Sequence, residues 1–138
     1  MGTRSTVHFS SSYNEDRKRS KFCSIYRQYD GYPSCVGLEL GNFLKEAKGN
    51  GLECVAAQYV AKIKTEPYNV YMTYHNNRQE YNYYVNEEYI DMSGVKLSIK
   101  VTYQDYKYSN EKDKYVSVYR KLFEGDVDDF IRWCKNEN

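Results

Sequence analysis

Apolar side chains recur at helical spacing in the first half of the chain. Within residues 36–47 they lie at i, i+4, i+7, i+8 and i+11, which predicts a helix with one apolar stripe. The members of this stripe are Val36, Leu40, Phe43, Leu44 and Ala47. Ser34 is the candidate N-cap, and the segment Lys48-Gly49-Asn50-Gly51 ends the helix with a basic last turn followed by glycines.

Two further helices are predicted, over 52–64 and over 126–135. The apolar stripe of the first is Leu52, Val55, Tyr59, Val60 and Ile63, and beside it lie the small side chains of Cys54, Ala57 and Ala61. We expect this small-residue face to pack closely on a sheet. In the last helix Asp126 is the candidate N-cap, and Val127, Phe130, Ile131 and Cys134 form the apolar face.

Alternating positions predict strands on both sides of these helices. Near the N-terminus, a β-prone segment from Arg4 to Phe9 and a second at 22–29 predict a hairpin with a long polar tip at 10–20. The turn residues Asp30-Gly31-Tyr32-Pro33 follow this hairpin.

After Pro67 the spacing changes from helical to alternating. Residues 68–74 and 80–86 are predicted to pair as a hairpin around Asn76-Asn77. The clearest strand covers 95–103, and a further strand at 115–123 follows a polar loop at 105–114.

These elements predict an α+β fold. We expect a mainly antiparallel sheet of about five to six strands, with three helices packed mostly on one face. The 138 residues contain no recognisable linker or internal repeat, so we expect one domain covering residues 1–138.

Charge and hydropathy narrow the function classes. Twenty basic and 19 acidic side chains give a net charge of +1, so there is no strong signal for nucleic-acid binding. The basic run Arg17-Lys18-Arg19 with Lys21 is typical of a solvated hairpin tip. No apolar stretch is long enough to span a membrane, and the N-terminus has no signal-peptide core. We therefore expect a cytoplasmic protein, in the host cytosol or the virion if its source is viral. The oligomeric state is not indicated.

The chain is rich in tyrosine, with 17 residues of this type. Tyrosine has a large apolar body and one polar tip, so many of these side chains are expected to line strands with the hydroxyl in water. An AT-rich genome would also produce an excess of Tyr, Asn and Lys.

No motif of an established catalytic centre is present. The four cysteines, Cys23, Cys35, Cys54 and Cys134, have no C-x-x-C spacing and lie far in sequence from His8 and His75. We therefore predict free thiols, no metal site, no cofactor and no catalytic residue.

One segment concentrates candidate site residues where a predicted strand runs into the first helix. It is Tyr26-Arg27-Gln28-Tyr29-Asp30-Gly31-Tyr32-Pro33. If the first two strands pair, the guanidiniums of Arg4 and Arg27 could meet near the N-terminal end of that helix. Such an arrangement would suit a phosphate or a carboxylate. The candidate ligand-binding residues are Arg4, Arg27, Tyr29, Asp30 and Tyr32, with Tyr26 as a further stacking ring.

A structural interpretation of the same segment stays open. In it, Asp30 pairs with an arginine and the tyrosine rings cover the helix end, with no ligand present.

Several segments resemble an uncharacterised family of proteins from bacteria, phages and large DNA viruses. These are Gly2-Thr3-Arg4-Ser5, the segment 26–33, Gly37-x-Glu39-Leu40, Phe43-Leu44, residues 54–58, Phe123-Glu124-Gly125 and Phe130-Ile131-x-Trp133-Cys134. The family usually has a second glycine near Ser34-Cys35, which this chain lacks. The resemblance implies an intact domain of cytosolic or viral origin and no particular activity.

Three functional interpretations follow. The favoured one is a non-enzymatic binding or host-interaction accessory protein, whose partner is an anionic small molecule or a host or viral protein. The second is an enzyme that acts on a phosphate-bearing small molecule through Arg4, Arg27 and Asp30. The third is a virion-associated structural protein. None of the three involves a membrane.

Overall fold

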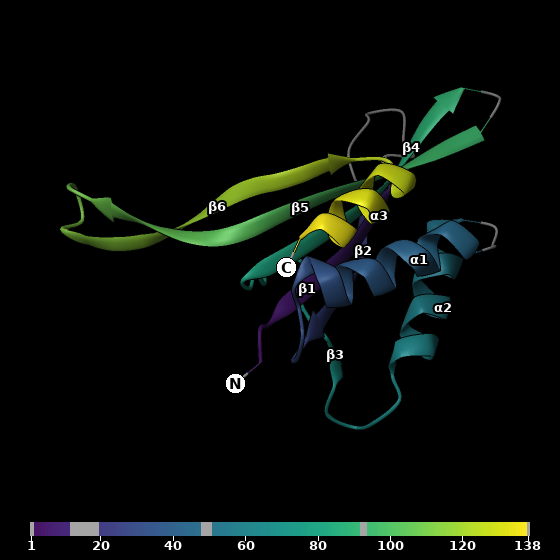
Figure 1. Ribbon diagram of the computed structural model, residues 1–138, viewed down its shortest axis with the longest axis horizontal. Coiled ribbons are helices and arrows are strands. Elements are labelled where there is room, and N and C mark those ends of the chain that lie inside the picture. Colours follow the sequence, from purple (N-terminus) through teal and green to yellow (C-terminus); the bar gives the residue numbers. More distant parts are fainter. Residues whose placement is uncertain (1, 12–19, 48–50, 92–93, 138) are drawn as a thin grey trace.

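The computed structural model describes residues 2–11, 20–47, 51–91 and 94–137 (Figure 1). In chain order the elements are β1 (Ser5–Ser11), β2 (Ser20–Arg27), the π-helical turn η1 (Pro33–Gly37), α1 (Leu38–Glu46), α2 (Leu52–Ile63), β3 (Val70–Met72), β4 (Tyr81–Asp91), β5 (Gly94–Ser109), β6 (Lys114–Gly125) and α3 (Val127–Asn136). The predicted basic tip at 17–19 and the helix end at 48–50 lie outside the described residues. No helix in the described segments is long and apolar enough to cross a membrane.

The strands form one six-stranded sheet in the order β3-β2-β1-β4-β5-β6. Every pair is antiparallel except β1 with β4, which is parallel. The α+β class and the mainly antiparallel sheet are therefore confirmed, as is the N-terminal hairpin.

The predicted hairpin between 68–74 and 80–86 is wrong. The short β3 pairs with β2 instead, and β4 pairs with β1. β4 pairs with β1 because this pairing completes buried rows of apolar side chains that run across the sheet. Val7 of β1 lies between Ile25 and Tyr83, and all three side chains are fully buried. A local hairpin would leave β1 at an edge and these rows incomplete.

Polar pairs on the other face fix the register of β1 against β4. The Thr6 hydroxyl donates to Asn82 Oδ1 at 2.7 Å, and the Ser10 hydroxyl donates to Asn86 Oδ1 at 2.6 Å. Both pairs join directly opposite residues of the two strands. A one-residue slip would break both bonds and turn the apolar side chains away from the core.

The helices pack on the apolar face of the sheet (Figure 1). Leu40 from α1, Tyr59 from α2 and Phe130 from α3 are fully buried against the strand rows. The three predicted helices are confirmed within a few residues of their expected bounds. The Asp126 cap is also confirmed, since its side chain accepts from the Asp129 N–H at 2.8 Å.

Two details of the helices differ from expectation. Ser34 is not an N-cap, because the helical path already begins at Pro33 after Tyr32, with no side-chain cap. Proline at the first position has no N–H to be capped. The small side chains of Cys54, Ala57 and Ala61 are exposed rather than packed on the sheet. The larger stripe next to them takes the buried position, since it removes more apolar area from water.

The last two strands extend well beyond the rest of the sheet. β5 continues to Ser109 and β6 begins at Lys114, so the predicted loop at 105–114 is wrong: most of it is strand. The ring centroids of Tyr108 and Tyr115 lie 5.3 Å apart, with one ring on each of the two strands. Such cross-strand aromatic pairs stabilise strands whose sequence lacks an alternating apolar pattern. We call residues 105–118 the arm, which projects away from the helices (Figure 1).

We predict that Leu40→Ala lowers the free energy of unfolding by about 2–5 kcal/mol, because it removes a fully buried side chain from the core. Phe43→Ala should have a similar effect. Asn42→Ala, at an exposed position of the same helix, is the matched control and should change stability by less than about 0.5 kcal/mol. Urea denaturation measures all three. Losses below about 0.5 kcal/mol in both core variants would show that this stripe is not core.

Candidate functional site

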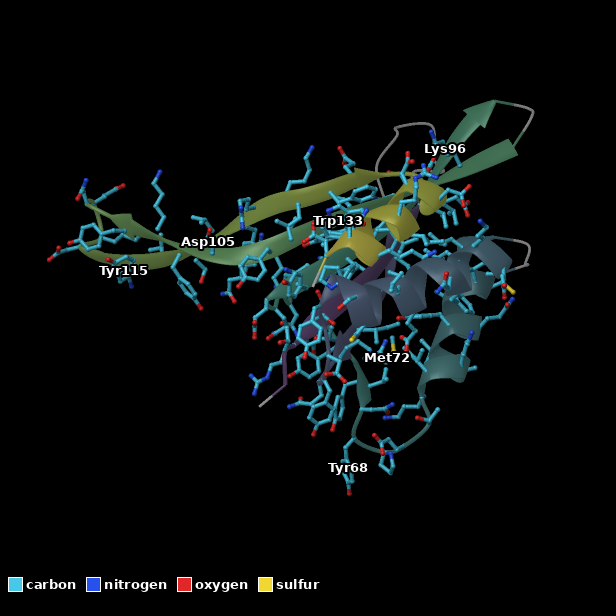
Figure 2. The ribbon with its side chains drawn as sticks, in the orientation of Figure 1. Tyr68, Met72, Lys96, Asp105, Tyr115 and Trp133 are labelled. Atoms are coloured by element: carbon cyan, nitrogen blue, oxygen red, sulfur yellow. The ribbon has the colours of Figure 1, made fainter. Side chains whose placement is uncertain are left out.

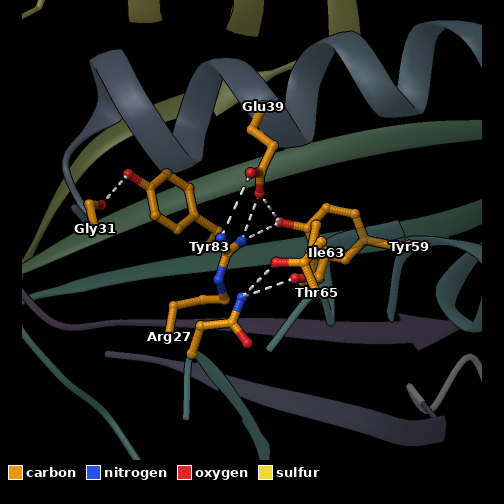
Figure 3. Close-up of polar contacts among 8 residues, drawn as sticks. Arg27, Gly31, Glu39, Tyr59, Ile63, Thr65 and Tyr83 are labelled. Atoms are coloured by element: carbon orange, nitrogen blue, oxygen red, sulfur yellow. Dashed lines mark hydrogen bonds and ion pairs between the residues drawn. The ribbon is translucent and has the colours of Figure 1, made fainter. Parts of the chain in front are cut away.

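Arg27 ends β2 and is held by side chains from two helices. Its Nη1 donates to Glu39 Oε1 at 2.5 Å and to the Tyr59 hydroxyl at 3.0 Å. The Tyr59 hydroxyl donates in turn to Glu39 Oε1 at 3.2 Å. Figure 3 shows these three side chains meeting between the helices and the strands. We call them the Arg27 triad.

The triad is buried unevenly. The Arg27 side chain is 11% exposed and Tyr59 is fully buried, whereas the Glu39 side chain is 39% exposed. Burial alone would lower the pKa of Arg27, but the hydrogen bonds and charges of Glu39 and Tyr59 outweigh it and raise that pKa. Burial raises the pKa of Tyr59 well above its usual value. Both groups therefore keep their protons at neutral pH. The stability that they provide is complete below the ordinary pKa values of arginine and tyrosine, and it is lost as pH rises from those values through the raised ones.

The turn after Arg27 brings the chain against β1. Asp30 has a left-handed backbone with φ 55°, and the Gly31 N–H donates to the Thr3 carbonyl at 2.9 Å. The hydroxyl of the buried Tyr83 donates to the Gly31 carbonyl at 2.7 Å. A Cβ on Gly31 would lie 2.7 Å from the Ser5 Cβ, so only glycine fits this approach.

A cleft of about 400 Å³ lies beside the triad. Its lining residues are Arg27, Tyr29, Asp30, Cys35, Val36, Glu39, Glu66 and Asn69. Three of these carry carboxylates, and the single guanidinium is already paired with Glu39. The charges of the lining therefore favour a cation, whereas the sequence pointed to an anion.

Asn69 contributes an acceptor that has no partner. Its Nδ2 donates to the Ile63 carbonyl at 2.9 Å and lies 3.4 Å from the Thr65 hydroxyl. Because a carbonyl can only accept, the amide nitrogen must face Ile63. Asn69 Oδ1 is then sealed from solvent and accepts no hydrogen bond among the described residues.

The structure brings together only part of the predicted site. Arg27, Tyr29 and Asp30 line the cleft, but Arg4 lines a separate depression with Glu80 and Gln104. Ser5 lies opposite Arg27 in the β1–β2 register, so Arg4, one position earlier, belongs to the other face of the strand. The predicted convergence of Arg4 with Arg27 is therefore wrong.

The predicted carboxylate partner of Arg27 is also wrong. Glu39, not Asp30, pairs with it. The side chain of Asp30 instead accepts from the Tyr32 hydroxyl at 3.3 Å, and this carboxylate raises the pKa of Tyr32. The ring of Tyr26 lies apart from the cleft, with its hydroxyl bonded to Gln28 and its ring 6.1 Å from that of Tyr71.

Sequence reasoning missed four members of the site: Glu39, Tyr59, Glu66 and Asn69. Glu39 is part of the motif Gly37-x-Glu39-Leu40 and stands next to the apolar stripe of the first helix, which was a usable signal. Tyr59 was expected to be buried, but its hydroxyl needs a polar partner, and that partner was not sought. Glu66 and Asn69 lie in the connection from α2 to β3, where no pattern marks them.

All four cysteines are free thiols in the structure. Among the described residues, no group of three or more His, Cys, Asp or Glu side chains could hold a metal ion.

Comparison with protein-family models, with curated proteins and with solved structures finds no match for this chain. The functional inference therefore depends on the geometry and charge of the cleft.

We predict an asymmetry between the two partners of the buried ion pair. Glu39→Ala leaves the Arg27 charge buried without a carboxylate and should cost about 3–5 kcal/mol. Arg27→Met keeps an apolar stem and leaves Glu39 with access to water, so it should cost only about 1–2 kcal/mol. The double variant should be no less stable than Arg27→Met alone. Denaturant unfolding of the three proteins checks this; equal and additive losses would contradict the role given to the triad.

We predict that Gly31→Ala destabilises the protein by about 1–3 kcal/mol, because the new methyl group would overlap the Ser5 side chain and the backbone at Arg4. Cys35→Ala changes an exposed residue of the same region and serves as the control. Thermal denaturation should show a lower Tm for the first variant and an unchanged Tm for the second. A Gly31→Ala protein that melts with the parent would show that the turn is free to move away from β1.

Proposed function

We propose that this chain is a non-enzymatic binding protein whose cleft holds a donor-rich organic cation, such as an alkylammonium or alkylguanidinium group. The observation that carries the proposal is the lining: three carboxylates and one guanidinium, which is already paired with Glu39. The carboxylates of Asp30 and Glu66, which are not paired with Arg27, suit an N–H donor.

The size of the cleft supports a small ligand. About 400 Å³ lies within the range of pockets that bind small molecules. Tyr29 is half-exposed at this cleft, and its ring offers a face for cation–π contact with a positive group. The same chemistry suits a Lys or Arg side chain of a host or viral protein. A phosphate-bearing ligand has less support, since it would meet three carboxylates.

The resemblance to bacterial, phage and viral proteins extends this proposal to the location of the protein. We propose that it is a cytoplasmic accessory factor of its host or virus. The four free thiols support a reducing compartment.

NMR titration with agmatine, with a short Arg- and Lys-containing peptide and with inorganic phosphate tests the proposal. We expect agmatine or the peptide to shift the Asn69 side-chain amide with a Kd of about 1 mM or tighter, and phosphate to have no effect. The peptide and agmatine arms distinguish a protein partner from a small molecule.

The variant Asp30→Asn/Glu66→Gln should weaken cation binding by about fivefold or more, because it removes two charges from the lining. Asparagine tolerates the left-handed backbone at position 30, so the fold should be kept. Glu53→Gln changes an exposed carboxylate outside the lining and should leave the affinity unchanged. Tighter binding of phosphate than of either cation would overturn the proposal, as would the absence of any binding.

A further inference from the structure

The arm is a two-stranded ribbon that the rest of the sheet does not support. The pairing of β4 with β5 ends at Tyr103, so residues 105–118 pair only with each other among the described residues. Each of them is exposed or half-exposed. An isolated hairpin is marginally stable in water, and this one carries large side chains in solvent.

Strand alternation sorts the side chains of the arm and its base onto two sides. One side, which we call the tyrosine side, consists of Lys100, Thr102, Gln104, Tyr106 and Tyr108 of β5 with Tyr115, Ser117, Tyr119, Lys121 and Glu124 of β6. It combines four tyrosines and two lysines with one carboxylate, Glu124, which pairs with Lys121. At the tip, the Tyr108 hydroxyl donates to Asp113. The opposite side contains Asp105, which pairs with Arg120. Tyr106 and Tyr115 are 63% and 69% exposed, and Tyr115 lies near the tip (Figure 2).

Cations surround the base of the tyrosine side. The guanidinium of Arg78 lies over the ring of Tyr119, 4.2 Å from its centroid. The Lys100 ammonium lies 5.2 Å from the ring centroid of Tyr84. Lys121 is exposed and bonds to Glu124 at 3.3 Å. Positive charge and open aromatic rings thus occur together on one surface.

We propose that the tyrosine side, with Arg78 at its base, binds single-stranded nucleic acid. The cations complement a phosphate backbone, and rings on alternate residues, about 7 Å apart along a strand, can each stack on a separate base. A protein partner would need an acidic and apolar surface to fit the same side, whereas every base of a single strand offers a π-face. This role is separate from that of the cleft, which is acidic and opens elsewhere.

Fluorescence anisotropy with labelled oligo-dT and oligo-U of about 20 nucleotides tests the proposal. With about three phosphate contacts, the affinity should fall roughly tenfold to twentyfold between about 50 and 200 mM salt. A duplex of the same length should bind more weakly, because its bases are stacked and cannot reach the rings.

The variant Tyr106→Ala/Tyr108→Ala/Tyr115→Ala should weaken binding at least about tenfold. Its matched control is Tyr68→Ala/Tyr74→Ala, which removes two exposed tyrosines that lie outside the arm. Arg78→Gln/Lys121→Gln should flatten the salt dependence by about two phosphate contacts. If the triple variant fails to fold, Tyr115→Ala alone, at the most exposed of these rings, replaces it.

Three results would overturn the proposal. One is no binding of either oligonucleotide at about 100 μM protein and low salt, which is weaker than ordinary non-specific binding. Another is an equal loss of affinity in the arm and control variants. The third is a parent protein that sediments as a dimer and a triple variant that sediments as a monomer, with no oligonucleotide bound: the tyrosine side would then be an interface between two copies.

Discussion

The contact of Arg27 with Glu39 and Tyr59 is the constraint on which the N-terminal half depends. It joins the end of β2 to α1 and α2. Removing a partner of Arg27 would leave a buried charge unpaired and would cost much stability. Once Arg27 is fixed there, the following turn must pass close to β1, which leaves room only for glycine at position 31. The cleft is the space that remains between this turn, α1 and the connection to β3.

A single ion pair in this position has both a structural and a chemical effect. It pairs the one guanidinium of the cleft lining with Glu39, so the carboxylates of Asp30 and Glu66 dominate the charge of that lining. The tyrosine side of the arm differs from the cleft, because it combines exposed rings with Arg78, Lys100 and Lys121 and has one carboxylate, that of Glu124.

Local patterns predicted the elements better than their partners. Apolar spacing located all three helices, and alternation located the strands, because both depend on residues close in sequence. The pairing of β1 with β4 could not be foreseen, since it depends on Val7 and Thr6 matching residues far along the chain. Within the site, the turn at Asp30 and Gly31 carried its own signal. Glu39 and Asn69 became recognisable only when the fold brought them beside Arg27.

The parallel pairing of β1 with β4 also sets an order for folding during synthesis. The bond between Thr6 and Asn82 spans 76 positions of the sequence. The first hairpin, though complete within the first 27 residues, leaves the backbone N–H and C=O groups on one edge of β1 unpaired until β4 has left the ribosome. Such non-local pairing slows folding, and an unpaired strand edge in the meantime invites association with other chains. The central strand of this sheet is thus synthesised among the first elements and paired on both sides among the last.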